Sequence, residues 1–354
     1  MAEASMETGT DRLVWDEATL IAEHAYPREH REAGLRLHGG LDLDGTYISP
    51  RTLHRWPAVR AWQAALAARG WPLIEADTEL LSVPQFPNEA QQRLLIAHGL
   101  GQTFWDSLSI TGIIEARGIA LVNFTAPDFA TLTDHDLSGM CIGHLNAGLL
   151  TAHGWDEGGR KDLGIGGHDD MWFAVRDLLF GKDRWPVPEA PASIARPIGA
   201  REMPQLPEPF EATLRLLMNV LMIEVRAERA FRFYEQVIGT PDLFPVPDAD
   251  RLLAGELVDR IRTDEAIHVA YLQTVISEFR SLPIRTVDGA VVQGAEIVDP
   301  VWARMVRWHA VEMHEAARPQ QIETMRARLL AQDEGPALLE AFAALADPLQ
   351  PGGA

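Results

Sequence analysis

The sequence predicts an all-α protein whose core is a bundle of four long helices. Long stretches of the chain keep the three- and four-residue spacing of apolar side chains that one helix face requires. Prolines and glycines separate these stretches. Their order is also informative, because two long stretches, a proline-rich segment and two more long stretches follow one another. The four expected helices cover residues 88–125, 134–153, 208–238 and 249–281.

Capping and breaking residues set the ends of these helices. Asn88 is a favourable N-cap for the first long helix, and Pro127 ends it. Residues 182–207 contain six prolines, so we expect an extended crossover there. A second proline-rich turn separates the last two long helices. The boundaries therefore support two helix pairs joined by one long connection.

Shorter elements are expected on both sides of the bundle. A helix fits residues 57–70, with a proline in its first turn. The segment 284–293 alternates around Asp288-Gly289 and predicts a β-hairpin, the only notable β element expected. Further short helices are expected at residues 169–180, 299–317 and 320–332. We expect one domain, made of an N-terminal appendage (1–87), the bundle (88–282) and a C-terminal hairpin with helices (283–354).

The composition limits the classes of function. Lys and Arg number 31 against 51 Asp and Glu, so the formal charge is −20, which argues against nucleic acid or an anionic membrane as a partner. The single cysteine, Cys141, excludes an internal disulfide and a thiolate-rich metal site. No apolar run approaches the roughly 20 residues that span a bilayer, and no secretory signal pattern is evident. We expect a cytoplasmic protein without membrane insertion.

The segment RTDEAIHVAYLQ (262–273) contains the most informative pattern. Glu265 and His268 are three residues apart, so on a helix they share a face and can reach one metal ion. The preceding helix offers Glu224 and Glu228 on an apolar stripe, where a carboxylate is costly to bury without a cation or a donor. The alternatives are a solvated face for the first pair and arginine salt bridges for the second.

These patterns resemble those of ferritin-like di-iron and di-manganese proteins. In that family two helices each contribute a Glu and two others each contribute Glu-x-x-His. The segments RAERAF and RIRTDEAIH resemble the second helix pair of the ribonucleotide reductase small subunit and its di-iron relatives. The resemblance implies that Glu228, Glu265 and His268 bind metal and that Asp264 lies behind them. Glu224 is then a supporting group or an alternative ligand.

The first helix pair matches the family pattern less well. His144 is the expected histidine, but Cys141 stands three residues before it, where the family has Glu. Glu115 is the preferred lone carboxylate, and Asp106 is the alternative. Cys141 is open to three interpretations: a packing residue, a soft ligand, or a sign that the site holds one metal or none. His144 itself can also be a hydrogen-bonded core residue.

The C-terminal helix MVRWHAVEMHEAAR adds one more pair of candidates. His309 and Glu312 are three residues apart and could provide a missing ligand or a proton relay. An exposed helix face is the alternative for this pair. The expected metal ligands are therefore Glu115, His144, Glu228, Glu265 and His268.

The resemblance implies a non-haem di-iron oxygenase. Its expected cofactor is iron, with manganese as the alternative, O2 is the co-substrate, and an external donor supplies electrons. The run of the chain also resembles azoxy-forming di-iron proteins of the valanimycin type. That resemblance implies N-oxidation of a hydrazine in natural-product biosynthesis. The alternative, favoured by Cys141, is a degenerate ferritin-like protein that binds a small molecule without redox catalysis. The oligomeric state stays open, with a homodimer among the options.

Overall fold

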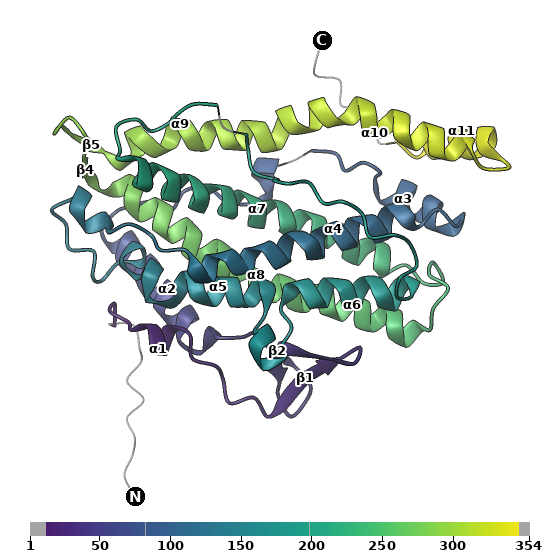
Figure 1. Cartoon of the computed structure of the whole chain (residues 1–354), viewed down its shortest axis with the longest axis horizontal. Coiled ribbons are helices and arrows are strands. Elements are labelled where there is room, and N and C mark those ends of the chain that lie inside the picture. Colours follow the sequence, from purple (N-terminus) through teal and green to yellow (C-terminus); the bar gives the residue numbers. More distant parts are fainter. Residues whose placement is uncertain (1–11, 82, 198, 347–354) are drawn as a thin grey trace, which may run out of the picture.

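The computed structural model describes residues 12–81, 83–197 and 199–346. This part of the chain is mostly helical, with two small antiparallel sheets (Figure 1). The helices α7 and α8 pack side by side, as the sequence predicts, and α6 packs against both α4 and α8. The bounds of these four helices are α4 Gln102–Gly118, α6 His168–Phe180, α7 Glu208–Ile238 and α8 Asp248–Ser281.

The helix expected at residues 134–153 does not form as one piece. A 3-10 turn (Cys141–His144) and a π-helical turn (Leu145–Leu149) precede the true helix, α5 (Leu150–Gly158). Gly148 has a φ of 109°, which a continuous α-helix cannot contain. The carboxylate of Glu278 also accepts two backbone N–H groups at the start of the 3-10 turn, at 2.9 and 2.8 Å. This segment therefore packs as irregular structure, and α5 starts later than predicted.

A glycine-rich loop, residues 159–167, separates α5 from α6. Gly159 has a φ of 72°, and a Cβ there would lie 2.5 Å from the backbone nitrogen of Gly167. Only glycine permits so close an approach. The last turn of α5 and the first turn of α6 are thereby held together, and both helices pack along α4 (Figure 1). The loop is also tied to the N-terminal sheet, because the His38 N–H donates to the Gly166 carbonyl at 2.9 Å.

The N-terminal part contains a sheet that the sequence analysis missed. Its three antiparallel strands, in the order β1-β2-β3, are Arg28–Glu32, Leu35–Leu41 and Tyr47–Ile48. The expectation that the hairpin is the only notable β element is therefore wrong. These strands are rich in charged residues and glycine, so they lack the apolar alternation that indicates a strand. The sheet lies below α6 and α8 in Figure 1.

The remaining elements surround the long helices. The expected hairpin is present as β4 (Pro283–Arg285) and β5 (Val291–Gln293). The helices α9 and α10 form an upper layer above α7 (Figure 1) and are joined by a π-helical turn, Trp308–Glu312. The other helices are α1 Glu17–Leu20, α2 Thr52–Ala68, α3 Glu89–Ala97, α9 Gly294–Arg307, α10 Met313–Leu330 and α11 Gly335–Ala344. Short 3-10 turns occupy Thr78–Leu81, Ile119–Asn123, Phe129–Leu132 and Lys161–Leu163.

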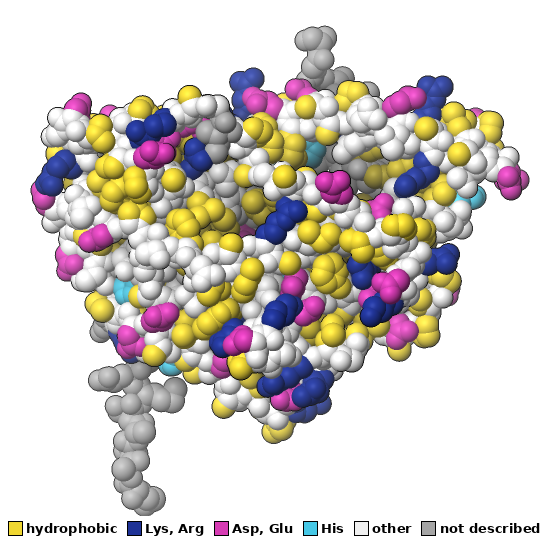
Figure 2. Space-filling view, viewed as in Figure 1, with side chains coloured by type: hydrophobic (Ala, Val, Ile, Leu, Met, Phe, Trp, Pro, Cys, Tyr) yellow, Lys and Arg dark blue, Asp and Glu magenta, His cyan; other side chains and the backbone are white. Residues whose placement is uncertain are grey.

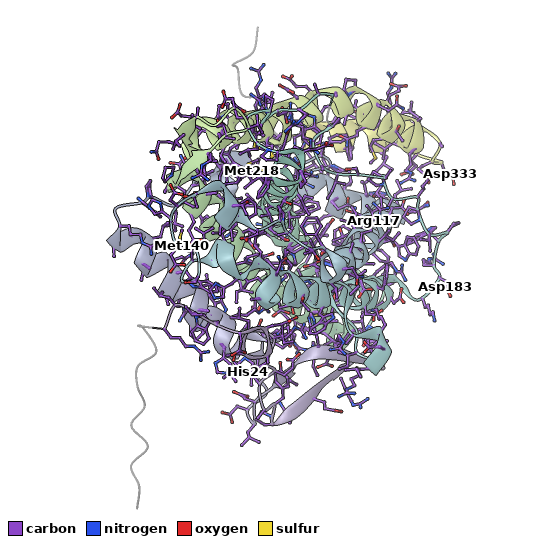
Figure 3. All side chains as sticks on the ribbon, turned by 60° about the vertical axis from the view of Figure 1, so that its left-hand side comes forward. His24, Arg117, Met140, Asp183, Met218 and Asp333 are labelled. Atoms are coloured by element: carbon purple, nitrogen blue, oxygen red, sulfur yellow. The ribbon has the colours of Figure 1, made fainter. Side chains whose placement is uncertain are left out.

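Side chains fill the space between the helices, as Figure 3 shows. The largest cluster of buried apolar residues extends from Trp15 to Met305 and so draws on all three expected segments of the chain. A second cluster packs α6 against the C-terminal half of α7 and the N-terminal half of α8. Within the described residues, no helix is both long and apolar enough to cross a membrane.

Candidate metal centre

Four glutamates and three histidines meet inside the bundle, contributed by five helices. They form two overlapping groups that share Glu157, and in each group one donor atom per residue lies within 4.8 Å of the others. Two ligands on opposite sides of a first-row metal ion lie about 4–4.6 Å apart, so both groups have the size of a metal site. The groups are His153, Glu157, Glu224 and His268, and Glu115, Glu157, His168 and Glu265.

Two of the carboxylates connect the groups. Oε1 of Glu157 lies 3.4 Å from His153 Nε2, 3.5 Å from His168 Nδ1 and 3.3 Å from His268 Nδ1. The two oxygens of Glu265 divide between the groups, with Oε1 at 3.0 Å from His168 Nδ1 and Oε2 at 2.6 Å from His268 Nδ1. Both glutamates could therefore contribute an oxygen to an ion held by either group.

Each histidine presents one ring nitrogen to the glutamates and the other to a fixed polar partner. His153 Nδ1 contacts the Tyr271 hydroxyl at 2.7 Å. His268 Nε2 lies 3.0 Å from Asp156 Oδ2, and His168 Nε2 lies 3.3 Å from Asp264 Oδ2. Metal-binding histidines usually make such an outer contact, because it fixes the tautomer and the ring orientation. The arrangement turns the inner nitrogens toward the glutamates, where they could act as ligands together with the carboxylates.

The N-terminal appendage supports these outer partners. Arg51 and Arg55 of the α2 region both bind Asp156, with Arg55 Nη2 at 2.7 Å from Oδ2. These charges hold the pKa of Asp156 well below its usual range despite its burial. Asp264 accepts the Tyr47 hydroxyl at 2.8 Å, and Oδ2 also lies 3.1 Å from Nε2 of His38. The missed sheet thus has a defined role, which is to hold Asp264.

Negative charge is in excess at the centre. Four glutamates and two aspartates face two guanidinium groups, so neutral imidazoles leave an excess of four negative charges. Burial, and then the charge of Glu265, raises the pKa of Glu224 to about 7. Burial alone would lower the pKa of His268, but Glu265 and Asp156 raise it well above its usual value. Two divalent cations would balance the excess and displace these protons.

Three buried atoms of the cluster have only ion-pair contacts at 3.0–3.5 Å, and none of these contacts has the geometry of a hydrogen bond among the described residues. They are Oε1 of Glu157, Oε1 of Glu265 and Nδ1 of His168. Buried polar atoms are rarely left without a partner, because each one costs about 1–3 kcal/mol. All three atoms face the interior of the same donor group. The residues present therefore fit a bound metal ion better than they fit a self-contained hydrogen-bond network.

The close approach of α4 and α5 depends on Gly118. A Cβ at this position would lie 2.4 Å from Cγ of Glu157. The missing side chain of Gly118 therefore makes room for the shared carboxylate. Glu115 is the only half-buried member of the cluster, and the others are buried. Burial and the charge of Glu157 raise the pKa of Glu115 well above its usual value.

The structure brings three of the five predicted ligands together, namely Glu115, Glu265 and His268. The placement of Glu228 is corrected. Its carboxylate accepts Arg232 Nε at 2.6 Å and Arg262 Nη2 at 2.8 Å, so it forms the salt bridge that was the alternative interpretation. Glu224, one turn earlier and kept open as an alternative ligand, lies in the cluster instead. Asp264 lies behind the cluster, as the resemblance implies.

His144 is also outside the cluster. Its Nδ1 contacts the Met140 carbonyl at 2.7 Å, and its Nε2 accepts the Trp15 N–H at 3.0 Å, so both ring nitrogens are occupied. Cys141 is buried with its Sγ 3.7 Å from the Tyr271 carbonyl, as a packing residue would be. The alternatives Asp106 and Glu312 do not join either group of donors, and Glu312 pairs with Arg307.

Three residues of the cluster were missed by sequence reasoning: His153, Glu157 and His168. His153 and Glu157 are four residues apart in LTAHGWDEGG, a spacing that places both on one helix face. This signal was present, but the helix was expected to end at His153. His168 follows the loop GIGG, and no local pattern connects it to the other ligands. Its role depends on the fold of that loop.

Comparison with protein-family models, with curated proteins and with solved structures finds no match to this chain.

Proposed function

We propose that this chain is a non-haem di-iron oxygenase that uses O2 to oxidise a small molecule. The observation that carries the proposal is the meeting of four glutamates and three histidines in two groups that share Glu157. Mixed carboxylate and imidazole ligands suit iron and manganese, and the resemblance of residues 262–273 to di-iron proteins favours iron. A pair of reduced iron ions, when bound, supplies electrons and open coordination positions for O2.

We also propose that the fold is a ferritin-like bundle with an interrupted second helix. The four helices would be α4, α5 continued by α6, α7 and α8. Each supplies one glutamate to the cluster, and the histidines come from α5, α6 and α8. This distribution supports the proposal, because ferritin-like centres draw their carboxylates from four helices. The interruption between α5 and α6 accounts for the third histidine, which opens α6.

The chain's own residues have distinct tasks in this proposal. The seven cluster residues bind the ions, and Asp156, Asp264 and Tyr271 fix the outer nitrogens of the three histidines. The burial of the cluster excludes water, which strengthens charge interactions inside it. Glu115 is the exception, since it is half-buried and lines a cavity. A substrate would therefore approach from the α4 side.

The alternative of a binding protein without redox chemistry loses its main support. It was favoured by Cys141 standing where the family has a glutamate beside His144. Both residues lie outside the cluster, and Glu157 supplies a carboxylate from α5 instead. N-oxidation of a hydrazine to an azoxy group, the specific reaction implied by the resemblance, is the first reaction to test.

The experiment is an anaerobic titration of the full chain with Fe(II), followed by exposure to O2 and monitored by absorbance. We expect about two iron ions per chain and an absorbance change that requires both iron and O2. Hydrazines and amines are then offered as substrates, and oxygenated products are identified by mass spectrometry. Failure to bind iron, or iron binding without O2 consumption, would contradict the proposal.

A further inference from the structure

A cavity of about 480 Å³ opens beside the metal centre. It is enclosed by α4, by α7 and by the π-helical turn that joins α9 to α10. Figure 2 shows the surface hollowed beneath the α9–α10 layer. Glu115 is the cluster residue that lines this cavity. The volume is in the range of sites that bind small molecules, so this cavity is the natural approach to the centre.

The walls of the cavity combine an apolar part with polar and charged side chains. Its apolar lining includes Ile110, Ile114, Ile223, Ala227 and Phe231. Three hydroxyl groups of the lining, from α4 and α7, hydrogen-bond to one another. The Tyr234 hydroxyl lies 2.6 Å from Ser107 Oγ and 3.3 Å from Thr111 Oγ1. The apolar part of the lining therefore suits an apolar molecular body, and charged side chains elsewhere in the lining can orient it.

Arg226 is the main charged exception. Its guanidinium lines the cavity, with Nη1 at 3.4 Å from the Ile194 carbonyl and 3.2 Å from Nδ1 of His309. Among the described residues, no carboxylate lies within ion-pair distance of it. Arg226 is only partly buried, but a cation that lies in a cavity without an anion still loses part of its hydration. A bound anion would offset this cost.

His309 also lines this cavity and contacts Arg226. Its side chain is fully buried, and Nε2 has no hydrogen-bond partner among the described residues. Burial and the neighbouring Arg226 lower the pKa of His309 to about 3, so the ring is neutral. Because Nδ1 faces the guanidinium as an acceptor, Nε2 carries the proton and can donate a hydrogen bond. The π-helical turn that contains His309 is a type of distortion often found at functional sites.

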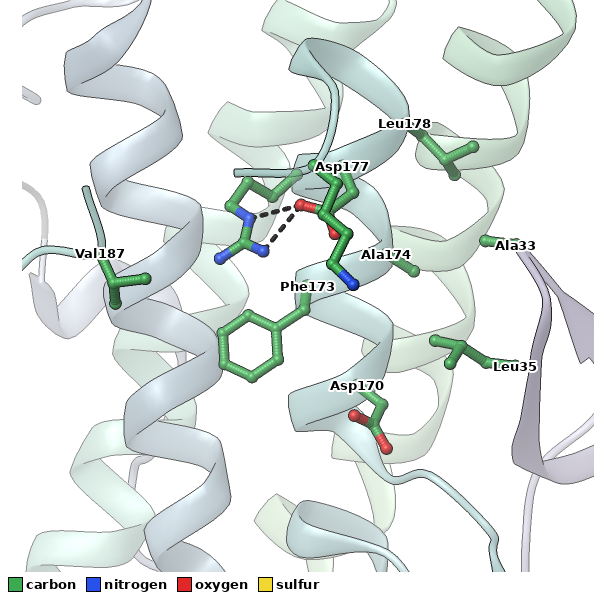
Figure 4. Close-up of a pocket in the computed structure, with 10 residues that line it drawn as sticks. Ala33, Leu35, Asp170, Phe173, Ala174, Asp177, Leu178 and Val187 are labelled. Atoms are coloured by element: carbon green, nitrogen blue, oxygen red, sulfur yellow. Dashed lines mark hydrogen bonds and ion pairs between the residues drawn. The ribbon is translucent and has the colours of Figure 1, made fainter. Parts of the chain in front are cut away.

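A second cavity also contains an arginine, but that arginine has an ion-pair partner. The cavity of about 640 Å³ on the outer face of α6 also contains an arginine, Arg176 (Figure 4). That guanidinium is paired with Asp177 at 2.7 Å, and no residue of the metal cluster lines the cavity. Of these two cavities, the one that reaches the metal centre therefore contains an arginine without an ion-pair partner.

We propose that the substrate of this centre is a small organic carboxylate with an apolar body. Its carboxylate would bind Arg226 and the Nε2–H of His309, and the body would lie along the apolar lining with its reactive end toward Glu115. That the bound carboxylate is a substrate rests on the proposed function. The anion site itself rests only on the residues of the cavity.

The charge of the anion follows from the groups that face it. One guanidinium without a carboxylate and one neutral imidazole match a single negative charge. The second arginine of the lining, Arg229, already donates to the backbone carbonyls of Leu81 and Val83. A carboxylate fits this count better than a phosphate dianion, and a guanidinium pairs with it through two parallel hydrogen bonds.

The test measures binding of matched acids and amides to the full chain by calorimetry, after iron has been removed with a chelator. The probes are benzoate, phenylacetate and hexanoate, each against its neutral amide. We expect at least one acid to bind about tenfold more tightly than its amide. The variant Arg226→Gln should abolish this preference, and Arg226→Lys should keep part of it. Arg232→Gln, an exposed change on the same helix, should leave it intact.

Thermal unfolding without ligand separates binding from structure. If the role of Arg226 is to bind an anion, Arg226→Gln should keep or raise the melting temperature of the ligand-free protein, because the variant removes a charge that has no ion-pair partner. The proposal is overturned if no acid is preferred over its amide, or if Arg226→Gln keeps the preference. It is also overturned if Arg226→Gln loses its fold and its melting transition while Arg226→Lys binds no acid. An acid preference in a protein that never takes up iron would support the anion site and count against the oxygenase.

Discussion

His153 of α5 and His268 of α8 stack face to face, with ring centroids 3.8 Å apart and ring planes 12° apart. Their outer nitrogens have separate partners, Tyr271 and Asp156, while their inner nitrogens both face Oε1 of Glu157 at 3.4 and 3.3 Å. Two imidazolium ions stacked this closely would repel each other. Two neutral imidazoles that bind the same cation would not, so the stack favours a metal-bound state.

The first prediction separates two glutamates that lie one turn apart on α7. Glu224→Gln keeps the side-chain volume but removes a carboxylate that lies 3.2 Å from His153. We expect the bound iron to fall from about two ions per chain to about one, because one donor group loses its charge. Glu228→Gln changes only a partly exposed salt bridge to two arginines and should keep both ions. Metal analysis after anaerobic loading measures the difference. Equal iron contents in the two variants would contradict the assignment.

The second prediction concerns an outer contact. Tyr271→Phe removes the hydroxyl that lies 2.7 Å from His153 Nδ1 and leaves the ring packing in place. Such outer contacts typically contribute about 10–100-fold to metal affinity, so we expect a loss of about tenfold or more with unchanged stoichiometry at saturating iron. Tyr234→Phe is the matched control, because its hydroxyl contacts Ser107 and not the cluster. An iron titration monitored by absorbance compares the two. A larger loss in the control would show that the contact to His153 has no special role.

The sequence was sufficient for features that depend on local pattern. The helices α7 and α8 carry long amphipathic repeats bounded by proline-rich turns, and both were predicted within a residue or two. Glu265 and His268 share a turn, so their common orientation follows from helix geometry alone. Glu115 was preferred for its separation from His144, and because His144 lies outside the cluster, that reasoning does not explain why Glu115 lies in it.

Features that depend on distant partners could not be read from the sequence. Glu224 and Glu228 lie on the same face, and the choice between them is made by Arg262, which comes from another helix and binds Glu228. The helical periodicity near His144 is broken by a glycine in the left-handed region and by Glu278, more than 130 positions away. His168 reaches the cluster only because the glycine loop before it folds back on α5.

The third prediction concerns pH. The pKa of Glu224 is raised from 4.5 to about 7, by burial and then by the charge of Glu265. The native state therefore holds this proton more tightly than the unfolded chain, and the metal-free protein should lose stability as the pH rises from about 4.5 to about 7. Iron binds the deprotonated carboxylate, so apparent iron affinity should rise over the upper part of this range and level off above it.

Two measurements check the sign of this effect. Urea unfolding of the metal-free protein at pH 5 and pH 8 should give the lower stability at pH 8, and Glu224→Gln should reduce the difference. Iron titrations at pH 6 and pH 8 should give the tighter binding at pH 8. Iron affinity that is independent of pH would show that no proton of the cluster is displaced.

The fourth prediction uses two glycines inside helices that differ in their surroundings. A Cβ at Gly118 would lie 2.4 and 2.6 Å from the Cγ and Cβ of Glu157, at the closest approach of α4 and α5. Gly118→Ala should therefore move Glu157 and destabilise the metal-free protein by about 1–3 kcal/mol, the usual cost of overpacking. Iron binding should weaken in both donor groups, because they share this carboxylate.

A Cβ at Gly255 would meet only Ile238, at an ordinary 3.8 Å, so Gly255→Ala should instead stabilise the protein by about 0.5–1 kcal/mol. Urea unfolding gives the two signs, and iron titration of both variants gives the effect on the centre. If Gly118→Ala proved as stabilising as Gly255→Ala and kept two tightly bound ions, Glu157 could not be the residue that joins the two groups.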